Sequence, residues 1–155
     1  MPLKPYIKAI IIPGLSFGLV IWAVQFASDQ YLISTGFTGM RATLFSITVL
    51  IVIPLLLVIT GVVSEIIRNR ERDTGWTLFI PYAAGFIAMS IAFLLFRIVS
   101  SVNQYLPYLS PGIMPRLSYV TGNIIMYFPV LIVISTLFAF FSLAGGYGMR
   151  RNQMR

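Results

Sequence analysis

The chain has 155 residues, of which 58% are hydrophobic and only 10% are charged, and its mean hydropathy is +0.91. Soluble globular domains are roughly 45–50% apolar and about 25% charged. Eleven basic and four acidic side chains cannot coat a water-facing surface of this size, so we expect lipid to solvate most of it. The chain contains neither Cys nor His, which excludes disulfides, thiol catalysis, and metal or haem sites built on histidine.

Four apolar stretches are long enough to cross a bilayer as helices, which takes about 20 apolar residues per crossing. A barrel strand is shorter and alternates in polarity, so we predict an all-α integral membrane protein with four transmembrane helices, forming a single domain over the whole chain. Glycines after the last stretch predict that its helix ends in a flexible basic tail. The four stretches cover residues 7–27, 42–67, 77–99 and 119–144.

The basic residues predict how the chain is oriented. Four crossings place both termini and the central loop on one side of the membrane, and the other two loops on the opposite side. Eight of the eleven basic residues fall on the first side, so the positive-inside bias places both termini in the cytoplasm. We expect the protein to lie in the cell (plasma) membrane. The eight are Lys4, Lys8, Arg68, Arg70, Arg72, Arg150, Arg151 and Arg155, against Arg41, Arg97 and Arg116.

A net charge of +7 is also typical of nucleic-acid-binding proteins, but the positions of the cations argue against that partner. They lie beside membrane ends and are not gathered on one face with aromatic residues between them. Attraction to anionic lipid headgroups on the inner side is sufficient to explain them. Contact with these headgroups or with a partner protein is predicted for Arg68, Arg70, Arg72, Arg150 and Arg151.

The two halves of the chain share a pattern of less common residues. A Gln-Tyr-Leu triplet follows both the first and the third stretch. Arg41 and Arg116 are 75 residues apart, and so are Pro54 and Pro129 within the second and fourth stretches. The pattern indicates a tandem duplication of a two-helix hairpin, with chance resemblance between apolar segments as the alternative. Copies of this kind share one orientation, related by a pseudo-two-fold axis along the membrane normal. The copies would span about 7–72 and 73–150.

Prolines and polar residues recur at related places in the apolar stretches. We predict helix kinks at Pro13, Pro54, Pro81 and Pro129. A proline inside a helix frees the carbonyl four residues earlier, which in lipid must be satisfied by a neighbouring helix, a hydroxyl or water. The polar residues of the second and fourth stretches either form interhelical hydrogen bonds or line a central pathway. The candidates for that pathway are Ser46, Thr48, Thr121 and Asn123.

Small residues follow one another at four-residue spacing on the first and third stretches. Gly14 and Gly18 form a GxxxG motif, and Ala84, Ala88 and Ala92 form an equivalent stripe. Such stripes let helix backbones approach closely in lipid. They either pair the first stretch with the third or face another subunit.

Charged residues near the membrane ends suggest ion pairs. Glu65 lies near the inner end of the second stretch, where it reaches the interface, pairs with Arg68 or Arg72, or binds a coupling ion. Asp29 follows the first stretch, and Arg97 lies near the outer end of the third. We predict an ion pair between Asp29 and Arg97.

These features argue against an enzyme. Nucleophilic catalysis needs a base, and without His only Lys4, Lys8 or a peripheral carboxylate is available. No cofactor or metal site is predicted. The leading hypothesis is a non-catalytic structural, anchoring or assembly subunit of a larger membrane complex, with other membrane subunits or further copies of the chain as partners. The alternative is a small channel or transporter whose pathway lies on the pseudo-two-fold axis.

Overall fold

A computed structural model of the chain describes residues 4–35, 38–70, 78–105 and 113–153. Nearly all of these residues are helical, in agreement with the predicted all-α fold. Four helical stretches are long and apolar enough to cross a membrane: Tyr6–Tyr31, Thr43–Arg70, Phe79–Val99 and Ser118–Arg151. The helices are α1 (Pro5–Thr35), α2 (Thr38–Ile47), the π-helical η1 (Thr48–Val52), α3 (Ile53–Arg70), α4 (Phe79–Tyr105) and α5 (Ile113–Gln153).

The last helix is longer than its apolar stretch. α5 has 41 residues and continues through the glycines at 145–148 to Gln153. The prediction of a flexible tail after residue 144 is therefore wrong. Gly145 lies against the backbone of Val58 in α3, and Gly146 lies against the ring of Pro81 in α4. These contacts fix the start of the glycine-containing segment of α5 against α3 and α4.

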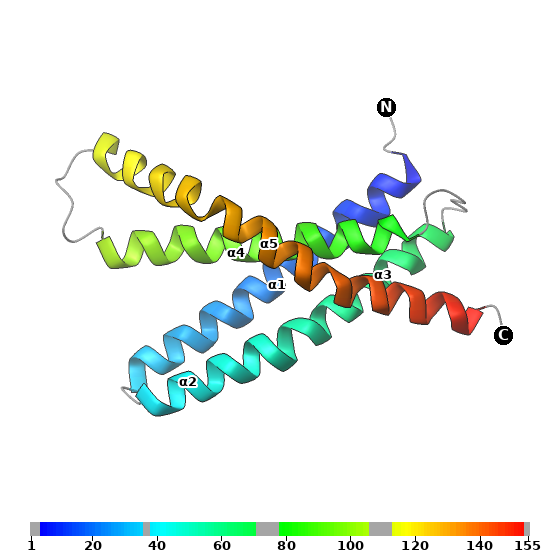
Figure 1. Cartoon of the computed structure of the whole chain (residues 1–155), viewed down its shortest axis with the longest axis horizontal. Coiled ribbons are helices and arrows are strands. Elements are labelled where there is room, and N and C mark those ends of the chain that lie inside the picture. Colours follow the sequence, from blue (N-terminus) through cyan, green and yellow to red (C-terminus); the bar gives the residue numbers. More distant parts are fainter. Residues whose placement is uncertain (1–3, 36–37, 71–77, 106–112, 154–155) are drawn as a thin grey trace.

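The helices cross near the middle of the molecule, and on one side of the crossing they separate into two arms (Figure 1). Figure 1 shows that α1 and α4 begin, and α3 and α5 end, at the same end of the molecule. Toward the opposite end the chain forms two arms that diverge. α2 and η1 contact α1, and among the described residues neither contacts α4 or α5. We call residues 5–22, 53–70, 79–92 and 131–153 the crossing region, residues 23–35 and 38–52 the first arm, and residues 93–105 and 113–130 the second arm.

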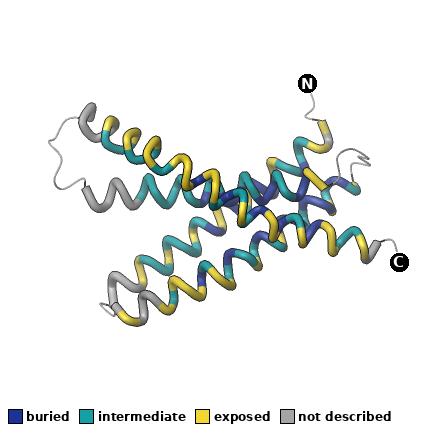
Figure 2. Tube along the Cα trace, in the orientation of Figure 1, coloured by how far each residue is buried: buried dark blue, intermediate teal, exposed yellow. Residues whose placement is uncertain are grey.

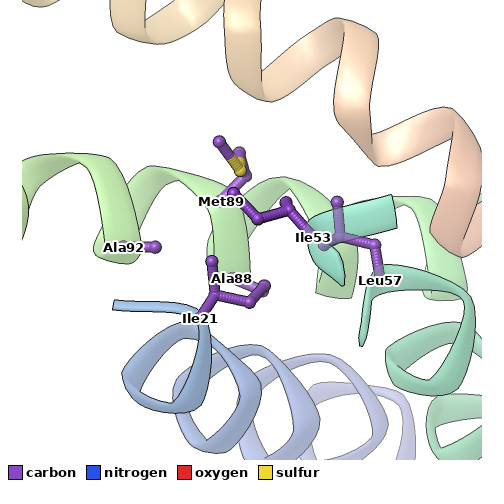
Figure 3. Close-up of a cluster of buried hydrophobic side chains, with 6 residues drawn as sticks. All are labelled: Ile21, Ile53, Leu57, Ala88, Met89 and Ala92. Carbon is purple, nitrogen blue, oxygen red and sulfur yellow. The ribbon is translucent and has the colours of Figure 1, made fainter. Parts of the chain in front are cut away.

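Burial separates these regions sharply. Of the residues whose burial is described, every buried one except Thr48 lies in the crossing region (Figure 2). Six buried apolar side chains from α1, α3 and α4 form a cluster where the arms begin (Figure 3). The cluster consists of Ile21, Ile53, Leu57, Ala88, Met89 and Ala92.

The proline of the second apolar stretch is accommodated by a change of helix type. Pro54 is the second residue of α3, the helix that directly follows η1. There the N–H of Ile53 donates to the carbonyl of Thr48, five residues earlier. This wider turn lets the chain continue as one helical stretch past the proline.

The other prolines lie in two kinds of place. Pro13 and Pro129 are inside α1 and α5. Pro81 is the third residue of α4, within the first helical turn. A missing N–H costs no intrahelical hydrogen bond at that position.

Candidate functional site

The small residues of the first and third apolar stretches lie against each other between α1 and α4. A Cβ added to Gly14 would lie 3.2 Å from the carbonyl oxygen of Ala84, and one added to Gly18 would lie 2.9 Å from that of Ala88. Ala92 continues the stripe into the buried cluster. The structure thus brings the two predicted packing stripes together within one chain.

A second close contact joins α3 to α5, and sequence reasoning missed it. A Cβ added to Gly61 would overlap the carbonyl oxygen of Ser142, and one added to Gly145 would overlap that of Val58. Backbone therefore touches backbone at this crossing. Gly61 has no glycine partner at four-residue spacing, so no motif drew attention to it. Gly145 suggested only a helix end.

Two serines link the helices of each hairpin near a proline. The hydroxyl of Ser64 in α3 donates to the carbonyl of Ala9 in α1, at 2.7 Å. That carbonyl is the one freed by Pro13, four residues later. The hydroxyl of Ser142 in α5 likewise donates to the carbonyl of Pro81 in α4, at 2.7 Å. Interhelical hydrogen bonds thus replace or supplement the backbone ladder at both places.

A buried ion cluster joins α3 to the end of α5. Glu65 is 1% exposed, and its Oε1 accepts a hydrogen bond from Nη2 of Arg68 at 2.5 Å. The same oxygen lies 3.4 Å from Nε of Arg150. Arg68 also donates from Nη2 to Oδ1 of Asn69, at 2.9 Å. Removing the carboxylate would leave two arginine charges without their partner, which is costly in a buried site.

The arginines predicted to contact headgroups or a partner occupy different environments. Arg68 is buried and Arg150 is half-buried, both beside Glu65. Arg70 and Arg151 are exposed. Arg72 lies outside the described residues. Of the four described arginines of this group, only Arg70 and Arg151 are therefore fully presented to the surroundings of the helices.

The residues predicted to line a pathway lie on separate arms. Ser46 is exposed on α2, and Thr48 is buried on η1. Thr121 is exposed on α5, and Asn123 donates from Nδ2 to the carbonyl of Tyr119 in the same helix, at 3.2 Å. Since α2 and η1 do not contact α5 in the described part of the chain, the structure does not bring these four residues together.

Arg97 interacts with an aromatic ring of the second arm. Its Cζ lies 3.5 Å from the ring centroid of Tyr127 in α5, a cation–π geometry. The contact described for Arg97 is thus with a ring of its own arm. The ion pair predicted between Arg97 and Asp29 stays a prediction.

Among the described residues there is no group of three acidic, His or Cys side chains that could hold a metal ion. Comparison of the chain with protein-family models, with curated protein sequences and with solved structures gives no match. The class is therefore defined by the fold alone, as that of an all-helical chain with four helices long and apolar enough to span a membrane.

Proposed function

We propose that the chain is a non-catalytic multi-pass membrane protein that serves as a structural, anchoring or assembly subunit of a larger membrane complex. The observation that carries this proposal is the use of the buried polar side chains. Ser64 and Ser142 each donate to a carbonyl of a neighbouring helix, and Ser135 accepts from Ser90 at 3.0 Å. Glu65 is held between two arginines. Side chains engaged in this way hold helices together and are poorly placed to bind a substrate.

The proposed topology places both termini in the cytoplasm and the chain in the plasma membrane, as two copies of one hairpin. α1 begins and α5 ends at the same end of the molecule (Figure 1), which supports the placement of both termini on one side of the membrane. The basic residues on that side support its assignment as the cytoplasmic side. The serine-to-carbonyl hydrogen bond near a proline in each hairpin supports the duplication. A channel or transporter with a pathway on the pseudo-two-fold axis has less support, because its candidate lining residues lie on separate arms.

Purification from the native membrane tests the functional proposal. A tagged chain extracted in a mild detergent should elute with a stoichiometric companion chain, identified by mass spectrometry. The matched control is a tagged Gly61→Ala variant, which should lose the companion because its helix crossing is disrupted. A monodisperse homo-oligomer of the wild-type chain with no companion would contradict the proposal.

The absence of Cys makes the topology directly testable with single cysteines. Lys4→Cys and Arg151→Cys lie at one end of the bundle, and Gln30→Cys lies toward the other; all three side chains are exposed. A membrane-impermeant maleimide should label only Gln30→Cys on intact cells, and all three after lysis. Labelling of Lys4→Cys and Arg151→Cys on intact cells would show that both termini lie outside the cell, which would contradict the proposed orientation.

A further inference from the structure

The four prolines of the apolar stretches are not equally compensated. The carbonyl freed by Pro13 accepts a serine hydroxyl from α3. The chain widens into η1 ahead of Pro54, and Pro81 lies within the first turn of α4. Pro129 lies in the interior of α5, which stays α-helical around it. The carbonyl of Ile125, four residues earlier, therefore loses its partner within the helix.

No side chain in the described part of the chain donates a hydrogen bond to this carbonyl. Asn123, the nearest amide side chain along α5, donates to the carbonyl of Tyr119. The hydroxyls of Tyr82 and Ser90 reach α5 from α4, but they donate to other residues. Ile125 lies seven residues inside the span that begins at residue 118, about 10 Å along the helix. An acceptor in such an apolar environment is costly until a donor satisfies it.

The free carbonyl lies on an open face of α5. A helical carbonyl points along the axis toward the residue four positions later. Ile125 is 67% exposed and Pro129 is exposed too, so the group between them faces away from the neighbouring helices. Gly122 lies on the same face one turn earlier, and a Cβ added to it would meet nothing within 4 Å. A second helix can therefore come close to the backbone of α5 at this place.

The span that carries this face is the least buried of the four. Only 17% of its most apolar part is buried within the chain, against 28–39% in the other three spans. A bare apolar face by itself would be covered by lipid tails. Lipid tails carry no hydrogen-bond donor, however, and the free carbonyl needs one. The carbonyl thus distinguishes this face from the other exposed apolar surfaces of the chain.

We propose that a transmembrane helix of the companion subunit packs on this face and donates a Ser or Thr hydroxyl to the carbonyl of Ile125. The proposed function is a premise of this inference, since it supplies the companion. A hydroxyl is the expected donor because the chain satisfies its own carbonyls at Ala9 and Pro81 in that way. Gly122 allows the close approach that such a short side chain needs.

Photo-cross-linking in the native membrane tests where the companion lies. The photoreactive residue p-benzoylphenylalanine is placed at Met126, next to Ile125, and in a matched experiment at Leu50 of the first arm. Both side chains are 73% exposed. The probe at position 126 should join a transmembrane peptide of the companion that contains Ser or Thr, and the probe at position 50 should not. Products with lipid alone, with a second copy of the chain, or equally from both positions would overturn the proposal.

Two glycine variants assign the contact to the open face. Gly122→Leu fills the space for the second helix and should lower recovery of the companion at least tenfold. The matched control is Gly148→Leu, the same substitution on α5 at another glycine with nothing within 4 Å, and it should recover the companion like the wild type. Because both positions are exposed, both variants should unfold like the wild-type chain. Equal recovery by the two variants would overturn the proposal.

The wild-type chain separates this inference from the proposed function. If it recovers no companion, both fail. If it recovers a companion that position 126 does not join, this inference alone fails.

Restoring the missing N–H tests the hydrogen bond itself. In Pro129→Ala, residue 129 can bond the carbonyl of Ile125 within α5, so the companion's hydroxyl loses its acceptor. The dissociation constant of the purified pair should rise about threefold, the loss expected for one interhelical hydrogen bond in lipid. Replacing the cross-linked Ser or Thr of the companion by Ala should have the same effect, and no further effect in the Pro129→Ala background. Additive effects of the two substitutions would overturn the assignment of the donor.

Discussion

The crossing region and the two arms are built from the same kinds of apolar helix, yet they pack very differently. In the crossing region, Gly14, Gly18, Gly61 and Gly145 allow backbones to approach, and serine hydroxyls link neighbouring helices. The arms lack comparable contacts with each other in the described residues, and large side chains such as Leu50 and Met126 are 73% exposed. Figure 2 shows the same division along the chain.

The difference follows from the physics of helix association in lipid. Lipid tails are as apolar as leucine, so apolar side chains alone give helices little reason to associate. Close packing and interhelical polar bonds supply the attraction instead. The crossing region has both, and the arms present mostly bulky aliphatic side chains to their surroundings. Substitutions should therefore affect stability far more in the crossing region than in the arms.

The largest effect is expected where two backbones touch. Gly61→Ala places a methyl group on the carbonyl of Ser142 and should cost about 3 kcal/mol or more, because neither backbone can move alone. Gly122→Ala in the second arm meets nothing within 4 Å and should be neutral or slightly stabilising. Unfolding of both variants in mild detergent, compared with the wild type, checks this. Equal stability of the two variants would contradict the difference in packing between the crossing region and the arms.

Loss of the buried carboxylate should cost nearly as much. Glu65→Gln keeps the shape of the side chain but removes the charge that Arg68 and Arg150 share, for an expected cost of about 3 kcal/mol. Arg151→Gln removes an exposed charge and should change stability by less than about 0.5 kcal/mol. Denaturant titrations of the two variants provide the comparison. A stable Glu65→Gln protein would show that the ion cluster contributes little.

A cavity in the buried cluster should have an intermediate effect. Leu57 is fully buried, and Leu57→Ala should cost about 2 kcal/mol through lost packing contacts. Met126→Ala in the second arm should cost less than about 0.5 kcal/mol, because the side chain already faces outward. Parallel unfolding curves measure both. Similar losses of stability for the two substitutions would mean that the Met126 side chain is packed as tightly as that of Leu57, which would contradict the difference between the arm and the buried cluster.

The smallest effect is expected at a single interhelical hydrogen bond. Ser64→Ala removes the donor to the Ala9 carbonyl and should cost about 1 kcal/mol. In a Pro13→Ala background the residue at position 13 regains its N–H and can bond that carbonyl itself, so Ser64→Ala should then cost almost nothing. A double-mutant cycle measures this coupling. Additive effects would show that the serine does not compensate for the proline.

Sequence reasoning located the four apolar helices because hydropathy is a local property. It identified the stripes on α1 and α4, since glycine and alanine spacing is visible in one segment. It could not predict the backbone contact of Gly61 with Ser142 or the ion pair of Arg150 with Glu65. Both contacts depend on how α3 packs against α5, which is distant in the sequence.

The polar residues show a different limit of the sequence. Ser46 and Thr121, like Thr48 and Asn123, occupy matching positions of the proposed copies, which predicts similar depth. Residues at matching depth need not be close together. These four residues lie on two arms that diverge. Likewise, charge and position alone suggested an ion pair between Arg97 and Asp29, and they could not reveal that Arg97 lies over the ring of Tyr127.

Cysteine cross-linking in native membranes tests the division into a packed crossing region and separate arms most directly. The pair Ser46→Cys and Thr121→Cys spans the two arms, and the pair Phe93→Cys and Ile124→Cys lines one pocket within the second arm. Oxidation should join the second pair within one chain and leave the first pair unjoined. An intramolecular disulfide between positions 46 and 121 would contradict the account, because it would require the arms to close into one bundle.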